Sequence, residues 1–238
     1  MVNERQGIGV ERRVALIVLS TALACLLLYV VEQVLGVNYL VKTLVKLVLF
    51  AGIPWGYAWL TDSTPQVGEC RVRRGLRMLP ASLKLGLFLG AAAFGAIFLA
   101  YFLFQSALDL PAIARELQEK SRITPSNFLL VGAYVTFGNS LLEEWFFRGF
   151  VFLTLHRLGW SRLAYGYSSL LFALYHIAIF RTWFSPGLMI LALLGLVTIG
   201  LIFDWLNAKT DHFLSSWLTH VLADTAIILI GLRLMGMA

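Results

Sequence analysis

Two adjacent carboxylates and a guanidinium interrupt a long apolar run, at Glu143, Glu144 and Arg148. The run extends from about Phe128 to Leu155, and a charge near the middle of a bilayer costs at least about 2.5 kcal/mol. Glu144 and Arg148 are four residues apart with the acid first, which favours an ion pair on one helix face. Glu143 lies roughly 100° around the helix from Glu144, so it needs a different partner.

Two later apolar runs carry histidines at helical spacing. Phe172 and His176 are four residues apart, as are His220 and Asp224, so each pair shares one helix face. Polar side chains from three helices can converge on one small volume inside a bundle. Each residue alone also has a structural interpretation, as a hydrogen-bond bridge between helices or as one member of an ion pair.

A carboxylate beside histidines can activate water. Glu143 would be a general base, and His220 could stabilise the oxyanion of a tetrahedral intermediate. Alternatively, Glu143, His176 and His220 could hold zinc, with water in the open coordination position. The His-Glu-x-x-His spacing of common zinc peptidases is absent from the sequence. Spacing and composition therefore leave open a choice between no cofactor and a divalent metal.

The composition is that of a membrane protein. Of 238 residues, 59% are hydrophobic and 13% are charged, whereas soluble domains are about 45–50% apolar and about 25% charged. The net charge of +6 does not indicate nucleic acid, because Lys and Arg also accumulate in cytoplasmic loops and beside anionic headgroups. We therefore expect an integral multi-pass protein whose partner is the lipid bilayer.

The predicted fold is an all-α, polytopic transmembrane helical bundle. It has about seven spans, with an eighth half-span or re-entrant segment as the alternative. The expected spans are Val14–Leu35, Tyr39–Leu60, Ala81–Phe104, Phe128–Leu155, Leu163–Phe180, Pro186–Leu206 and Phe213–Leu234, each near the roughly 20 residues that cross a bilayer. We also expect a basic loop at Arg71–Arg77 and a surface helix at Pro111–Lys120. The distribution of Lys and Arg predicts a cytoplasmic N-terminus in a plasma (inner) membrane.

The polar residues gather from the fourth span onward. We interpret the chain, 1–238, as a single membrane domain with supporting helices in 1–108 and a catalytic core in 126–234. Lys42 and Lys46, near the start of the second span, are expected to snorkel to the interface or to pair with Glu32.

Smaller features of the spans carry further predictions. Small residues of the third span, including Gly86, Gly90 and Gly95, should let another helix approach closely. Asp204, near the end of the sixth span, is expected to act as a cap or to contact a neighbouring helix.

Three motifs together resemble those of a known family. The sequence contains Glu143-Glu144-x-x-x-Arg148, then Phe172-x-x-x-His176, then His220-x-x-x-Asp224. Their order, spacing and membrane placement resemble the CPBP (CAAX protease and bacteriocin-processing, or Abi) family of intramembrane endopeptidases. Type II CAAX prenyl endopeptidases belong to that family. The resemblance covers about Phe128 to Ile228.

The resemblance implies a role for each residue of these motifs. Glu143 would activate water, and His176 would position that water or bind a metal ion. Glu144 and Arg148 would brace the site.

The third motif would handle the developing negative charge. His220 would stabilise the oxyanion. Asp224 stands where the family carries Asn or Asp, and an ionised Asp cannot donate a hydrogen bond. We therefore expect Asp224 to orient His220 or to act as a ligand.

The resemblance also implies a reaction and a class of substrate. The expected activity is hydrolysis of peptide bonds in membrane-associated proteins, either prenylated CAAX-type or leader-bearing. The alternatives are a transporter of protons or metal ions, since acids and histidines also form relays, and a non-catalytic membrane scaffold.

Overall fold

The computed structural model describes residues 9–61 and 69–237, with the backbone alone for residues 69–80. All regular structure in these residues is helical. Within the described residues, six helices are long and apolar enough to cross a membrane. The predicted all-α polytopic bundle is therefore confirmed.

The first part of the chain forms two antiparallel helices and a long third helix. The elements are α1 (Val10–Tyr29) with its π-helical extension η1 (Val30–Val34), α2 (Tyr39–Leu60), α3 (Glu69–Phe104), the short 3-10 turn η2 (Gln105–Ala107) and α4 (Leu110–Glu119). Gly36, at φ +60, turns the chain between η1 and α2. The Asn38 side chain then caps α2 by accepting from the Val41 N–H at 3.0 Å, as capping residues commonly do.

The second part begins with a continuous helical rod over residues 128–157, which we call the rod. It consists of α5 (Phe128–Ala133), η3 (Tyr134–Asn139), α6 (Ser140–Glu143), η4 (Glu144–Phe152) and α7 (Leu153–Arg157), and both η3 and η4 are π-helical. The remaining helices are α8 (Ser161–Tyr175), α9 (Ile177–Phe180), α10 (Pro186–Thr210) and α11 (Leu214–Leu234).

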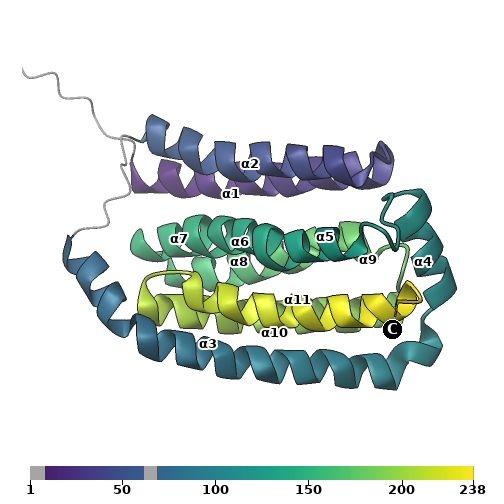
Figure 1. The fold of residues 1–238 in the computed structure, drawn as a ribbon. Coiled ribbons are helices and arrows are strands. Elements are labelled where there is room, and N and C mark those ends of the chain that lie inside the picture. The colour runs from purple at the N-terminus through teal and green to yellow at the C-terminus, as the bar shows by residue number, and fades with distance from the viewer. Residues whose placement is uncertain (1–8, 62–68, 238) are drawn as a thin grey trace, which may run out of the picture.

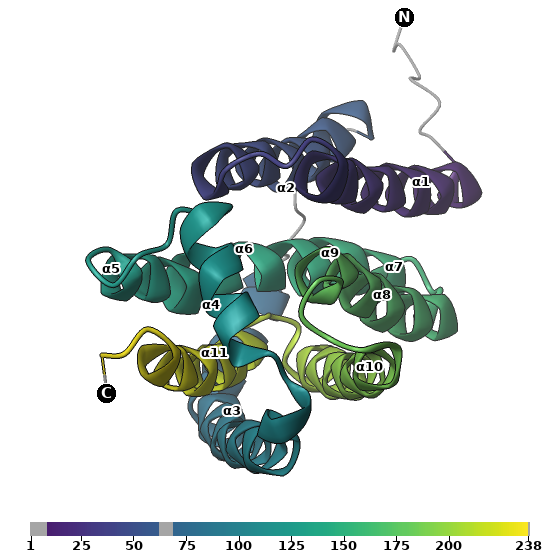
Figure 2. The ribbon, with the colours of Figure 1, turned by 90° about the vertical axis from the view of Figure 1, so that its right-hand side faces the viewer.

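The helices stack in layers whose axes run nearly parallel (Figure 1). In the end view, α1 and α2 form one outer layer and α3 lies on the opposite side (Figure 2). The rod and α8 lie beneath α1 and α2, and α10 and α11 lie between them and α3. The rod is thus covered on both faces by other helices.

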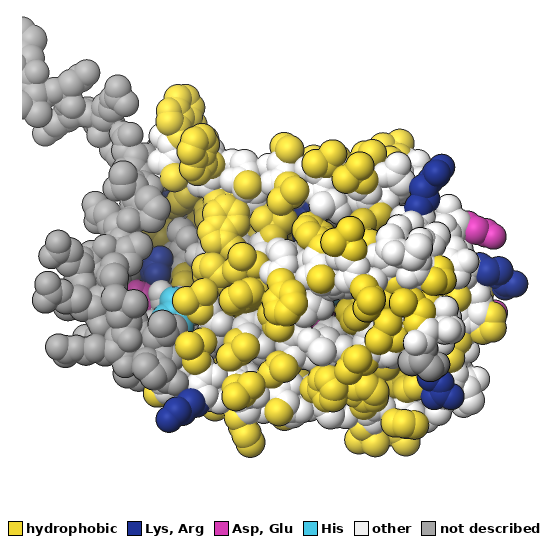
Figure 3. All heavy atoms as spheres, viewed as in Figure 1, with side chains coloured by type: hydrophobic (Ala, Val, Ile, Leu, Met, Phe, Trp, Pro, Cys, Tyr) yellow, Lys and Arg dark blue, Asp and Glu magenta, His cyan; other side chains and the backbone are white. Residues whose placement is uncertain are grey.

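The surface fits a bilayer. Apolar side chains cover most of the face shown in Figure 3, and most of the charged side chains on this face lie toward its two ends. Trp55 and Trp59 on α2 are 83% and 80% exposed, and exposed apolar surface of this extent marks a membrane or protein contact. The chain is an integral membrane protein.

Most of the predicted element boundaries lie close to the observed ones, and one predicted loop is wrong. The second span agrees at both ends, and the predicted surface helix is present as α4. The expected basic loop at 71–77 instead lies within α3, which continues beyond the apolar stretch. The fifth span, expected at Leu163–Phe180, is present as Ser161–Phe180, with a turn at His176 between α8 and α9.

Glycines set the distance between α3 and α11. A Cβ at Gly86 would lie 2.5 Å from the backbone oxygen of Ser215, and one at Gly90 would lie 2.5 Å from Leu222. The Thr219 hydroxyl also donates to the Gly86 carbonyl at 2.9 Å. The predicted close approach is confirmed for these two glycines. It is wrong for Gly95, whose Cβ would meet nothing within 4 Å.

Candidate functional site

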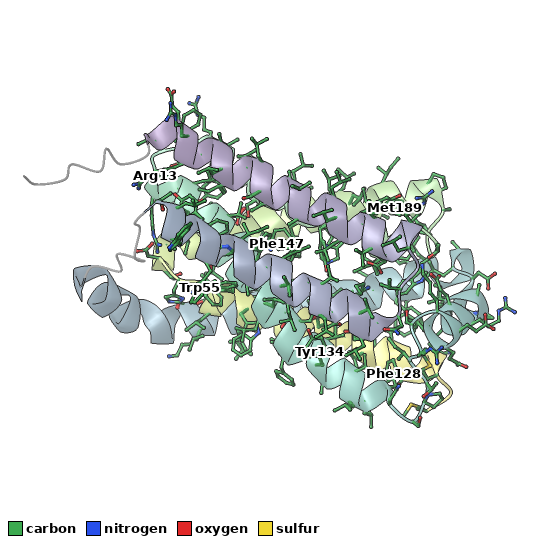
Figure 4. All side chains as sticks on the ribbon, turned by 90° about the horizontal axis from the view of Figure 1, so that it is seen from above. Arg13, Trp55, Phe128, Tyr134, Phe147 and Met189 are labelled. Atoms are coloured by element: carbon green, nitrogen blue, oxygen red, sulfur yellow. The ribbon has the colours of Figure 1, made fainter. Side chains whose placement is uncertain are left out.

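The rod places the acidic motif in the interior. Glu143 is 2% exposed, and Glu144 and Arg148 are completely buried. Phe50 of α2 stacks on Phe146 with ring centroids 3.9 Å apart, so α2 lies directly on this part of the rod. In the view from the side of α1 and α2, Phe147 lies beneath these helices, midway along the bundle (Figure 4). The two carboxylates are therefore enclosed by protein.

Arg148 lies among acidic and aromatic groups. Its Nη1 donates to Glu144 Oε1 at 3.1 Å, so the expected ion pair is present. Its Nε lies 3.6 Å from Asp204 Oδ1. The guanidinium also lies over the rings of Phe172 and Phe203, at 4.1 and 5.0 Å from their centroids.

Asp204 connects this cation to α8. Its carboxylate accepts from the Ser168 hydroxyl at 3.1 Å and from the Ser169 hydroxyl at 2.9 Å. The residue is completely buried. Contact with a neighbouring helix was one of the two predicted roles, and these bonds to α8 provide it.

His220 brings α11 to both carboxylates of the rod. Its Nδ1 lies 3.1 Å from Glu144 Oε1, and because a carboxylate only accepts, the imidazole donates there. Its Nε2 lies 3.8 Å from Glu143 Oε2 and 3.7 Å from Asp224 Oδ1. Glu144, rather than Asp224, thus makes the hydrogen bond that orients this imidazole.

His176 approaches from the end of α8. Its Nδ1 donates to the Phe172 carbonyl at 2.7 Å, since a carbonyl can only accept. The Phe172 ring contacts both imidazoles edge-on, with centroids 4.6 Å from His176 and 5.9 Å from His220. His176 also interacts electrostatically with Glu143. The three sequence motifs therefore meet in one place.

The partner of Glu143 is a lysine that our sequence interpretation assigned elsewhere. Lys46 Nζ lies 2.5 Å from Glu143 Oε1, and Lys46 is only 3% exposed. Snorkelling or pairing with Glu32 is therefore wrong for Lys46. Lys42 does pair with Glu32, at 2.6 Å.

Asn139 completes this arrangement and was also missed. Its amide donates to Glu143 Oε1 at 3.0 Å, and its Oδ1 accepts from Lys46 at 2.5 Å.

Two signals in the sequence could have indicated Lys46. It is an ionisable residue well inside a span, which is a functional candidate by default, and Glu143 had no assigned partner.

The residues expected to hold zinc do not fit a metal ion. Zinc binds carboxylate oxygens at about 2.0–2.2 Å, but Glu143 Oε1 already accepts from an ammonium at 2.5 Å. A divalent ion on this carboxylate would be close to that positive charge. Within residues 9–61 and 69–237, no group of three His, Cys, Asp or Glu side chains is arranged to hold a metal.

One of three comparisons with known proteins found a match. Residues 125–226 match the family model described as "Type II CAAX prenyl endopeptidase Rce1-like". No curated protein and no solved structure matched the chain. The matched segment contains the rod, α8 and α10, together with the part of α11 that carries His220 and Asp224. The family resemblance expected from the sequence is therefore confirmed over residues 125–226: this part of the membrane protein is similar to the type II CAAX prenyl endopeptidase Rce1-like family.

Proposed function

We propose that this protein is an endopeptidase that hydrolyses membrane-associated protein substrates with a water molecule activated by Glu143. The observation that carries the proposal is the asymmetric environment of this carboxylate. Oε1 accepts from Lys46 and Asn139, while Oε2 faces His220 Nε2 at 3.8 Å. That separation exceeds a direct hydrogen bond and suits a water molecule held by both groups.

The first chemical step is attack by water. Glu143 Oε2 takes a proton from the water as its oxygen attacks the carbonyl carbon of the scissile peptide. The imidazole of His176 is oriented by its bond to the Phe172 carbonyl, which leaves Nε2 of the neutral ring as an acceptor. His176 can therefore hold the second hydrogen of the water.

The second step is collapse of the tetrahedral intermediate. When Nε2 of His220 carries a proton, it can donate to the developing oxyanion, a contribution that in other enzymes is typically worth about 2.7–4 kcal/mol. The protonated Glu143 then gives its proton to the leaving amine, so the carboxylate returns to its starting state.

Glu144 and Arg148 position these groups. Glu144 Oε1 accepts both from His220, at 3.1 Å, and from Arg148, at 3.1 Å. The Phe172 and Phe203 rings limit the movement of the guanidinium. Asp224 Oδ1 lies 3.7 Å from His220 Nε2. It therefore adds negative charge near the ring nitrogen that is not bonded to Glu144.

We further propose prenylated CAAX-type or leader-bearing proteins as the substrates, in line with the family description of residues 125–226. The proposed orientation has a cytoplasmic N-terminus in a plasma (inner) membrane, in line with the bias of Lys and Arg along the sequence. Prenylated substrates would then approach from the lipid, where their anchors reside.

The test compares peptide termini by mass spectrometry in membranes that carry wild type or Glu143→Gln, in the native host. Gln keeps an oxygen that can accept from Lys46, but it is not a general base. Glu32→Gln is the matched control, because Glu32 pairs with Lys42 away from the site. We expect a defined set of termini to disappear only with Glu143→Gln.

Other outcomes would identify the alternatives. A terminus shared after cysteine would support CAAX-type processing, and one at a leader sequence would support peptide maturation. Unchanged termini would contradict the endopeptidase proposal. Ion flux that depends on Glu143 would then favour the transporter, and full rescue of a deletion phenotype by Glu143→Gln would favour the scaffold.

A further inference from the structure

Lys46 is a buried cation outside the segment that matches the family model. It lies on α2, is 3% exposed, and donates from Nζ to Glu143 Oε1 and to Asn139 Oδ1, both at 2.5 Å. Because Asn139 also donates to Glu143 Oε1 at 3.0 Å, the three side chains form a closed triangle.

A comparison within α2 argues against a general anchoring role. Lys42 lies one turn away on the same face, and it pairs with Glu32 through side chains that are 22% and 16% exposed. The side chains of Lys46 and Glu143 are only 4% and 3% exposed. Burial of a lysine in a helical bundle costs free energy. The more exposed Lys42 can anchor α2 at the membrane surface without that cost, so anchoring does not explain why Lys46 is buried.

The surroundings of Lys46 hold its ammonium in one place. Its Nζ lies 5.3 Å from the centroid of the Phe50 ring and 5.0 Å from that of Tyr175, and cations are attracted to such rings. Phe50 itself stacks on Phe146 of the rod. The position of the cation relative to the rod is therefore set by side-chain packing.

We propose that Lys46 is a positioning residue for the hydrolysis, one that holds Glu143 Oε1 and so directs Oε2 toward His220. This inference rests on the proposed function. Lys46 stays an ammonium throughout the reaction. The proton moves from water to Glu143 Oε2 and then to the leaving amine, so no further reactant is needed.

Charge balance gives a second reason for a cation at this position. Four carboxyl groups lie close together at the site, those of Glu143, Glu144, Asp204 and Asp224. Arg148 contacts Glu144 and Asp204. Lys46 supplies the fixed positive charge on the side of Glu143 that faces α2. The first helical pair would therefore take part in the reaction, which our sequence interpretation did not expect.

The experiment measures kcat and KM per folded mole for Lys46→Gln and Lys46→Arg, with Lys42→Gln as the matched control. The substrate is a peptide identified by the termini comparison. We expect Lys46→Gln to lower kcat about 100-fold with KM little changed, because small misplacements of a reacting group have effects of this order. Lys46→Arg keeps the positive charge but not the shape of the ammonium, so its kcat should lie between those of Lys46→Gln and wild type. Lys42→Gln should match wild type.

A second measurement separates positioning from folding. Lys46→Ala is assayed with added propylammonium and, in parallel, with propanol, which has a similar shape and no charge. Rescue by the amine alone supports the proposal. Wild-type kcat in Lys46→Gln, or equal rescue by both additives, would overturn it. A wild-type protein that cleaves, together with an inactive Glu143→Gln, shows that the proposed function stands even if the inference about Lys46 fails.

Discussion

Replacing Arg148 with methionine tests whether the buried ion pairs hold the site together. Arg148 is completely buried against Glu144 and Asp204, with N–O distances of 3.1 and 3.6 Å, and both carboxylates are also completely buried. Methionine has a similar volume but is shorter and carries no charge, so two acidic groups would lose their cation. Removal of one partner from a buried pair costs about 3–5 kcal/mol, a large share of a total stability of about 5–15 kcal/mol.

Arg157→Met provides the matched control. Arg157 lies on the same rod and bonds Asp211 at 2.7 Å, but the two side chains are 32% and 30% exposed. Exposed pairs contribute about 0–1 kcal/mol. The difference between the two variants therefore isolates burial, and we expect Arg148→Met to lose about 2–5 kcal/mol more than Arg157→Met.

The assay is unfolding of the purified protein by SDS in mixed micelles, with the free energy of unfolding taken from the transition. A third variant, Arg148→Met with Asp204→Asn, removes one of the two stranded charges and should regain part of the loss. Equal stability of Arg148→Met and Arg157→Met would refute the reasoning, because burial would then have no effect.

Two further predictions concern the helix interface and the cofactor. Gly86→Ala should lower the thermal midpoint in detergent, because its Cβ would lie 2.5 Å from the Ser215 oxygen and overpacking costs about 1–3 kcal/mol. Gly95→Ala on the same helix should leave the midpoint unchanged or raise it, and equal shifts would contradict this account. A zinc chelator should leave cleavage unchanged, because Lys46 already occupies Glu143 Oε1. Loss of activity that zinc restores would show that this is wrong.

The sequence was sufficient to predict the general architecture. Most spans could be identified from long apolar runs, because a membrane span is recognised by its length and its apolar composition alone. Helical spacing also predicted that Glu144 would pair with Arg148, and the distance is 3.1 Å. The motifs of three separate helices meet as expected, with His220 Nε2 3.8 Å from Glu143 Oε2. The assigned catalytic roles stay predictions.

Contacts between distant segments could not be predicted in the same way. Lys46 and Glu143 are 97 residues apart, and although Lys46 lies deeper in its span than Lys42, helical spacing relates it only to residues of its own helix. The π-helical parts of the rod likewise depend on what packs around them. The division into supporting and catalytic halves stays a prediction. The bond between Lys46 and Glu143 joins a residue of the predicted supporting half to one of the predicted catalytic half.

The packing of α2 on the rod has a consequence for modularity. A fragment that begins at residue 125 would contain every residue of the three motifs, yet it would leave Phe146 without the ring of Phe50 and Glu143 without its ammonium. Lipid chains could replace the apolar contact, but they cannot donate a hydrogen bond. The motif-bearing half is therefore not an interchangeable cassette. A transplant to another scaffold would need a cation and a flat aromatic side chain at the places that α2 now fills.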